Sequence, residues 1–291
     1  TFPRADRGAR VDDEEDGMNH HGMHRLKLAG ALPILGIAFT CQCLVAGEII
    51  CEGSDYPYHL QGVATDGTNL YWTFTTVLVK TDLQGKLVAK HEPKREGAHM
   101  GDLSCRNGKV YVGVGRGRRA DGSRIPGEVW EINAETLAVE RTFATPEAIW
   151  CNNGLAWWDG SWWVISSSPQ GFEYNILVEY DENFVYRETH LVKGGWTLLG
   201  VQTILAVGDR LLLGTYSSNT IVVDAKALRK KKRDVSKDTG VLRVVEKCST
   251  DVGMLMLNGK LYVARQKSHH AKGAERQEWS AKLVPLPRTH A

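Results

Sequence analysis

The stretch His59-Leu-Gln-Gly-Val-Ala-Thr-Asp-Gly-Thr-Asn-Leu-Tyr-Trp72 predicts two β-strands joined by a tight Asp-Gly turn. An Asp-Gly pair between two such runs is a strong signal for a β-hairpin. Four weaker copies of this stretch recur along the chain. They begin at His99, Asn153, Gln202 and Met254, and each has its own short turn that contains glycine.

Two further strand segments follow most of these hairpins, so the chain divides into five units. Five units of four antiparallel strands, each about 40 to 50 residues long, predict an all-β fold, a five-bladed β-propeller. The fifth unit supplies only three strands. We expect the isolated segment Glu48–Cys51 to supply its fourth strand, so that the N-terminal strand closes the last blade.

The N-terminal region is expected to lie outside the propeller. Residues 1–22, with the acidic run Asp12–Asp16, are expected to be a disordered extension. Met23–Gly47 has the order of a secretory signal peptide, because basic residues precede a short apolar run and then small residues. We therefore expect residues 48–291 to form a single domain that is secreted or periplasmic, without stable membrane insertion after cleavage. A retained membrane anchor is the alternative.

The bulk composition gives no reason to expect a nucleic-acid partner. The chain has 36 Lys and Arg residues against 34 Asp and Glu residues, a formal net charge of +2. A monomer is expected. The cysteines beyond the predicted signal peptide allow three disulfide pairings, and separate buried thiols are equally compatible with the sequence. These cysteines are Cys51, Cys105, Cys151 and Cys248.

The connections between strands predict which face of the propeller carries a binding site. In a blade of four antiparallel strands, the segment leading into the first strand and the loop between the second and third strands share one face. Those loops are long in three units, whereas the turns between the first and second strands are short in all five. Long loops on a rigid scaffold commonly form binding sites. We therefore expect a site at the mouth of the central channel on this elaborated face.

Polar residues in the segments that lead into the first strands should ring this mouth. The positions taken as equivalent in the five first strands are Val63, Leu103, Leu155, Ile204 and Leu255, and the polar residues lie up to four places earlier. Histidines and carboxylates in one ring can act as acid and base or bind a divalent metal ion. Pairing with backbone groups and channel water is the alternative role. The catalytic candidates are His59, His99, Asp102 and Asp251, with the two histidines also the metal candidates, and the ligand-binding candidates are Gln61, Asn153 and Gln202.

The long loop of the second unit is basic. Arginine side chains carry forked donors that match the oxygens of carboxylate or sulfate groups. We therefore expect an acidic glycan or peptide above the mouth, and a solvated loop without a ligand is the alternative. A second basic run, Arg229–Arg233, is expected to be a solvated loop away from the mouth. The arginines of the first loop are Arg116, Arg118, Arg119 and Arg124.

The segments His59-Leu-Gln-Gly-Val-Ala64, Tyr71-Trp-Thr-Phe-Thr75 and Leu199-Gly-Val-Gln-Thr203 resemble a group of secreted, largely uncharacterised bacterial propellers. This group is similar to the YVTN-repeat-like and glutamine cyclotransferase-like propellers. The resemblance implies the propeller fold over nearly the whole mature chain but carries no established activity. In that group the third unit often has a histidine at the position of Cys151. The cysteine in this chain departs from that pattern and argues against a three-histidine metal site here.

Three classes of function are compatible with these features. The first is an extracellular module that binds an acidic glycan or peptide over the channel mouth. The second is an enzyme at the same place, either a glycan lyase or hydrolase with His59 or His99 as base, or a cyclotransferase with Asp102 or Asp251 as proton shuttle. The third is a structural propeller that binds other proteins through its rim. The fold alone does not choose among them.

Overall fold

The computed structural model describes residues 47–53, 56–95, 97–216, 219–230, 241–245, 249–269 and 277–286. Residues 1–46, which include nearly all of the predicted signal peptide, lie outside these ranges, as does Cys248. Within the described ranges, no helix has the length and apolar character needed to cross a membrane.

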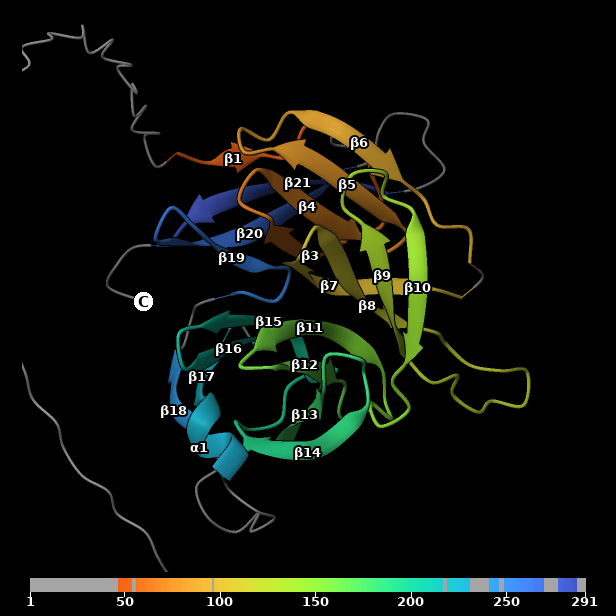
Figure 1. The fold of residues 1–291 in the computed structure, drawn as a ribbon, viewed down its shortest axis with the longest axis vertical. Coiled ribbons are helices and arrows are strands. Elements are labelled where there is room, and N and C mark those ends of the chain that lie inside the picture. Colours follow the sequence, from red (N-terminus) through yellow and green to blue (C-terminus); the bar gives the residue numbers. More distant parts are fainter. Residues whose placement is uncertain are drawn as a thin grey trace, which may run out of the picture. The chain divides into compact units, whose positions relative to one another are not determined.

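Five antiparallel β-sheets form the blades of a propeller, which confirms the predicted fold class (Figure 1). Blade 1 contains β3 (Leu60–Thr65), β4 (Asn69–Phe74), β5 (Val77–Asp82) and β6 (Leu87–His91). Blade 2 contains β7 (His99–Arg106), β8 (Lys109–Gly115), β9 (Glu128–Asn133) and β10 (Val139–Ala144). Blade 3 contains β11 (Asn152–Trp158), β12 (Ser161–Ser166), β13 (Tyr174–Tyr180) and β14 (Tyr186–Lys193). Blade 4 contains β15 (Val201–Val207), β16 (Arg210–Thr215), β17 (Thr220–Asp224) and β18 (Val241–Val245).

Blade 5 joins the two ends of the propeller. Its C-terminal part contains β19 (Met254–Leu257), β20 (Lys260–His269) and β21 (Glu278–Pro285). The short strands β1 (Ile49–Ile50) and β2 (Tyr56–Pro57) both pair antiparallel with β21. Between them, the backbone N–H of Cys51 donates to the carbonyl oxygen of Ala281 at 2.9 Å. The predicted closure of the last blade by the N-terminal strand is therefore confirmed.

The apolar core lies between neighbouring blades. Within the described ranges, five separate clusters of buried and partly buried apolar side chains are present, and each combines residues from two adjacent blades. Successive side chains on a strand point to opposite faces of its blade. A strand can therefore contribute side chains to the clusters on both sides of that blade. Trp162 packs toward blade 2 and Trp163 toward blade 4, as expected for consecutive residues of β12. This alternation fixes the order of the blades around the ring.

A short helix, α1 (Ala225–Lys230), follows β17 and was not predicted. Arg229 on this helix does not lie in a solvated loop, which corrects the expectation for its basic run. Its guanidinium carbon lies 4.6 Å from the ring centre of Trp158, and Nη2 is 2.9 Å from Oε1 of Glu179. The aromatic face and the buried carboxylate hold the arginine against blade 3. Residues 231–233 lie outside the described ranges.

Candidate functional site

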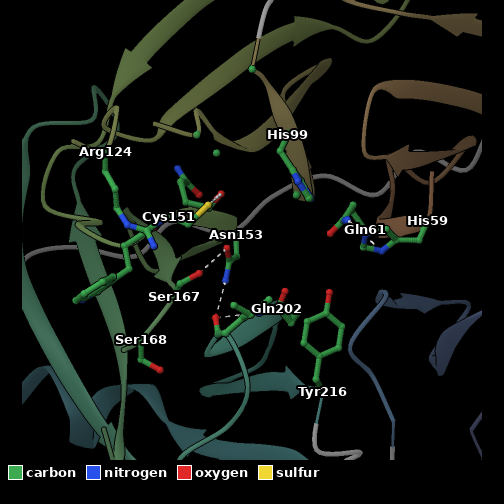
Figure 2. A pocket seen from close by; sticks show the side chains of 17 residues that line it. His59, Gln61, His99, Arg124, Cys151, Asn153, Ser167, Ser168, Gln202 and Tyr216 are labelled. Atoms are coloured by element: carbon green, nitrogen blue, oxygen red, sulfur yellow. Dashed lines mark hydrogen bonds between the residues drawn. The ribbon is translucent and has the colours of Figure 1, made fainter. Parts of the chain in front are cut away.

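A cavity of about 430 Å³ opens at the channel mouth on the elaborated face (Figure 2). Its walls come from the start of the first strands of blades 1 to 4, with the segments that lead into them, and from the residues that follow the second strands of blades 2, 3 and 4. Six of the predicted site residues line it: His59, Gln61, His99, Arg124, Asn153 and Gln202. The remaining side chains of the lining that bear on its chemistry are Trp150, Cys151, Ser167, Ser168, Leu199 and Tyr216.

Irregularities at the start of the first strands direct three amide side chains toward this cavity. The pairing register of β3, β11 and β15 shifts at Gln61, Asn153 and Gln202 respectively. A bulge leaves one residue without a cross-strand partner and changes the direction of its side chain. In β7 the shift falls around Gly101, where a Cβ atom would lie 2.1 Å from the carbonyl oxygen of Asn153. Blade 2 therefore contributes no amide to this ring.

His59 and His99 lie together at the cavity wall. Their ring centres are 6.1 Å apart in an edge-to-face arrangement, and Nε2 of Gln61 is 3.0 Å from Nε2 of His59. Removal from bulk water lowers the pKa of His59, against opposing effects of the Leu60 backbone and the Asp251 carboxylate. The same desolvation, together with the neighbouring His59, lowers the pKa of His99. The lowered pKa values favour the neutral form of both imidazoles at pH 7, and a neutral imidazole can accept a proton.

Asp251 lies one residue away from its expected position. Met254 pairs with Val263 as Val63 pairs with Trp72, so Met254 rather than Leu255 is the equivalent of Val63. The fifth unit contains four consecutive apolar residues, Met254–Leu257, so the local sequence pattern does not determine this register. The equivalent of His59 is therefore Thr250, which is buried. Its carbonyl oxygen accepts a hydrogen bond from the Thr203 hydroxyl, and its own hydroxyl shares a hydrogen bond with that of Thr220.

The carboxylate of Asp251 remains near the histidines without lining the cavity. Its charge acts on both His59 and Tyr216. The hydroxyl of Ser249 donates a hydrogen bond to its Oδ1. Asp251 can therefore influence the imidazole electrostatically, but it does not meet a ligand in the cavity directly.

Asp102 does not lie at the mouth, which corrects its predicted position. Its side chain is buried beneath the cavity, where the backbone N–H of Ile204 donates to Oδ2 at 2.9 Å. Gly62 and Gly154 make room for it, because a Cβ atom at either position would come within 2.4 Å of the Asp102 side chain. Burial raises the pKa of this carboxyl well above its ordinary value, and the hydrogen bond from Ile204 opposes the rise only in part.

Only one of the four predicted arginines lines the cavity. Arg116 is held by Glu128, with Nη1 and Oε1 3.0 Å apart, and this carboxylate also binds Arg95 and the Trp130 indole. Its guanidinium is thus engaged away from the mouth. Arg118 and Arg119 donate to the carbonyl oxygens of Gly122 and Arg124 within their own loop.

Arg124 projects to the cavity from the same loop. Its Nη1 donates to the carbonyl oxygen of Trp150 at 2.6 Å, and its guanidinium carbon lies 5.1 Å from the Trp150 ring centre. In the described part of the chain, no Asp or Glu lies within salt-bridge distance of Arg124, and none lines the cavity. Arg124 is therefore the positive charge that a ligand in the cavity would meet.

The residues at the mouth do not form a complete metal-binding set. Among the described residues, no group of three or more His, Cys, Asp and Glu side chains could hold a metal ion. His59 and His99 could thus supply two metal ligands, but the described residues offer no third side chain to complete the set. Cys151 lines the same cavity as a half-buried free thiol, and burial raises its pKa despite the nearby Arg124. Cys51 and Cys105 are also free thiols.

Several residues of the cavity were not predicted from the sequence. The hydroxyl of Ser167 donates to Oδ1 of Asn153 at 3.1 Å, whereas the buried Oγ of Ser168 has no hydrogen-bond partner in the described structure. Tyr216 occupies the corresponding place after the second strand of blade 4, and Trp279 lies 5.9 Å from His59 between ring centres. Position directly after a second strand is the signal that could have identified Ser167, Ser168 and Tyr216.

Comparison with known proteins supports the fold but identifies no close relative. No protein-family model matches the chain, and no curated protein matches it. The glutaminyl cyclase of Myxococcus xanthus superimposes with a TM-score of 0.51 at 12% identity, covering 82% of this chain and 97% of that one. This chain shares its propeller fold with that structure. A protein of unknown function from Bacteroides caccae matches less well, with a TM-score of 0.45 at 12% identity, over 75% of this chain and 82% of that one.

The resemblance inferred from the sequence is thus confirmed for this propeller at the level of fold. At 12% identity this similarity shows the fold alone and assigns no role to the residues of the cavity.

Proposed function

We propose that this propeller binds a small acidic or polar ligand in the cavity at the channel mouth. The observation that carries the proposal is Arg124, whose guanidinium lies on the cavity wall over Trp150 with no described carboxylate partner. A guanidinium carries forked N–H donors that match carboxylate, sulfate and phosphate oxygens. No Asp or Glu of the described lining repels an anion.

The other groups in the wall suit a ligand with both polar and flat surfaces. Neutral imidazoles at His59 and His99 offer one donor and one acceptor each, and Ser168 offers an unpaired hydroxyl. A cavity of about 430 Å³ lies in the range typical of small-molecule sites. It would enclose one sugar acid or one amino-acid residue, so a longer glycan or peptide would extend out of it.

Calorimetric titration of the purified protein with small carboxylates, uronic acids and acidic dipeptides tests this proposal. We expect Arg124→Gln to weaken binding of an acidic ligand by at least tenfold. The matched control is Arg118→Gln, which removes an arginine of the same loop that does not line the cavity. Equal affinities for the wild type and both variants would contradict the proposal.

An enzyme that transfers a proton at the same cavity is the second candidate. The observation that favours it is the contact between His59 and His99, since two neutral imidazoles can take up and return a proton at pH 7. Reactions of the cyclotransferase type need such a group, and no described carboxylate in the lining supplies one. A glycan lyase or hydrolase would use the same pair as base.

Turnover assays with N-terminal glutaminyl peptides and with acidic polysaccharides test the enzymatic candidate. We expect His99→Gln and His59→Gln to abolish product formation while leaving the melting temperature nearly unchanged. Ligand binding by the wild type without any product would support a binding module instead.

We also propose that the protein is exported, on the basis of the order of residues in Met23–Gly47. Fractionation of expressing cells and N-terminal sequencing of the mature chain test this. A mature N-terminus close to residue 48 is the expected result, and a chain that keeps residues 23–47 in the cytoplasm would contradict it.

A further inference from the structure

Two large side chains, one lining the cavity and one directly before His59, are exposed and have an unfavourable backbone conformation. Leu199, which lines the cavity, has a φ of 60° and is 54% exposed. Tyr58, directly before His59, has a φ of 67° and is 44% exposed. The left-handed region is disfavoured for bulky residues other than glycine, and such residues commonly mark functional sites.

Other bulky residues with this backbone conformation are stabilised by burial. Leu137 and Phe184 also have positive φ values, of 58° and 61°, but their side chains are 1% and 8% exposed. Packing in the core therefore offsets their strain. Tyr58 and Leu199 gain no such compensation from the described protein, so their conformation needs another explanation.

The strain at Leu199 is imposed by two of the predicted site residues. Its carbonyl oxygen accepts hydrogen bonds from Nε2 of Gln202 at 3.1 Å and from Nδ2 of Asn153 at 3.4 Å. These amides thus hold the segment that leads into β15 in position beside the cavity (Figure 2). The amide N–H donors of Gln202 and Asn153 are thus bonded to the backbone of the rim. We therefore do not assign these two side chains a contact with the ligand.

Further exposed apolar residues lie in the same kind of segment. Trp196 and Leu198 precede β15 and are 43% and 56% exposed, and Ile149 precedes β11 and is 61% exposed. We call Tyr58, Ile149, Trp196, Leu198 and Leu199 the rim patch. Its members precede the first strands of blades 1, 3 and 4, so they share the elaborated face with the cavity.

We propose that the ligand of this cavity is a carboxylic acid with an aliphatic chain, whose carboxylate lies against Arg124 and whose chain lies on the rim patch. This proposal rests on the proposed function and names its ligand class. The cavity encloses only a small head group, so the rest of a larger ligand must cross the rim. Leucine and isoleucine side chains favour an aliphatic chain there over a sugar, because they bury apolar area and offer no hydrogen bonds.

The ligand class predicts a dependence of affinity on chain length. Each buried methylene contributes about 0.8 kcal/mol, which corresponds to roughly fourfold in affinity. For acetate, hexanoate and decanoate below their aggregation concentrations, we therefore expect a rise of about fourfold or somewhat less for each methylene. Isothermal calorimetry on the full mature chain measures it.

Variants of the rim patch distinguish the contribution of the aliphatic chain to affinity from that of the carboxylate. Leu198→Ser and Trp196→Ser should weaken decanoate binding at least tenfold and leave acetate binding unchanged. Leu199→Asn should also weaken decanoate binding while keeping or raising the melting temperature, since asparagine tolerates the left-handed conformation better than leucine. The matched control is Val185→Ser, which removes a 61% exposed apolar residue in the turn between β13 and β14, on the opposite face.

The outcomes distinguish this proposal from the function on which it rests. Affinity that does not change from acetate to decanoate, with Arg124→Gln still weakening both, would overturn the aliphatic ligand but keep the anion site. A uronic acid that binds more tightly than decanoate, with an affinity that the rim variants do not change, would also overturn the aliphatic ligand and keep the anion site. If no member of the aliphatic series binds but a uronic acid or an acidic dipeptide does, the aliphatic ligand alone is overturned, and if none of these ligands binds, both proposals fail.

Discussion

The carboxylate of Asp102 accepts a hydrogen bond from the backbone N–H of Ile204 at 2.9 Å, and this bond ties blade 2 to blade 4 across the propeller axis. The bond lies beneath the cavity at the mouth. A second, smaller hollow of about 190 Å³ opens beyond it and is lined by apolar residues that include Leu103 and Met254. Asp102 therefore helps to separate the two ends of the central channel.

The first prediction concerns the pH dependence of stability caused by Asp102. Because the pKa of its carboxyl is raised in the folded protein, its contribution to stability is complete below the ordinary value of 3.8 and decreases as the pH rises through the folded pKa. We expect Asp102→Asn, which does not ionise, to gain stability relative to the wild type as the pH increases from 4 to 9. Denaturant unfolding of both proteins at several pH values measures the difference.

A non-polar variant tests whether the hydrogen bond to Ile204 matters in itself. We expect Asp102→Ala to lose about 1 to 3 kcal/mol relative to Asp102→Asn at each pH, since it leaves a buried N–H without a partner. If wild type and Asp102→Asn differ by a constant amount over the whole pH range, the carboxyl does not titrate abnormally.

The second prediction concerns the pH dependence of stability caused by His99. His99 has a lowered pKa in the folded state, whereas in the unfolded chain it titrates near the ordinary value of 6.5. The unfolded state therefore binds the proton first, and stability falls as the pH decreases below 6.5. We expect His99→Gln to remove part of this acid sensitivity, with Lys94→Gln as a neutral control on the preceding exposed segment. Imidazole resonances of His99 that titrate at or above pH 6.5 in the folded protein would contradict the prediction.

The third prediction concerns the ion pair between α1 and blade 3. Although burial opposes ionisation of Glu179, hydrogen bonds from His190 and Ser161 and the charge of Arg229 lower its pKa to about 2. We expect Arg229→Met to destabilise the protein by about 3 kcal/mol at pH 7, since it removes a main partner of a buried carboxylate. Thermal and denaturant unfolding provide the measurement.

Lys226 on the same helix provides the control, because its ion pair with Asp209 is exposed on both sides. Lys226→Met should change stability by less than about 0.5 kcal/mol. The depressed pKa of Glu179 also implies that stability is lost as the pH falls from 4.5 toward 2. A Glu179→Gln variant with an unchanged acid-unfolding profile would show that this carboxylate is not responsible.

The fourth prediction concerns closure of the ring by β1 and β2. Tyr56 is 3% exposed, and its ring centre lies 4.6 Å from that of Phe74 in blade 1. We expect Tyr56→Ala to cost about 3 kcal/mol, as for other large buried aromatic residues. Deletion of residues 1–57 should expose the edge of β21 and cause aggregation, whereas deletion of residues 1–46 should leave the melting temperature nearly unchanged. Equal behaviour of the two truncated proteins in light scattering would refute the role of this closure.

Sequence alone was sufficient for the blades, because a β-hairpin is a local structure. Alternating apolar residues and turns such as Asp66-Gly67 act between positions that are close in the chain. The closing strand at Glu48–Cys51 could also be predicted, since the fifth unit lacked one strand. Where this local signal was ambiguous, as at Leu255, the register was displaced by one residue and Asp251 was placed in the wrong position.

The tertiary structure decided which polar side chains face the cavity. Arg116 is bound by Glu128, Asp102 fills the space left by Gly62 and Gly154, and Asn153 holds the rim at Leu199. Each of these partners becomes a neighbour only when strands and loops pack together, and the energetic choice between pairing and exposure depends on that packing. The sequence therefore determined the scaffold and the face of the site, while contacts between distant segments decided which residues remain free to bind.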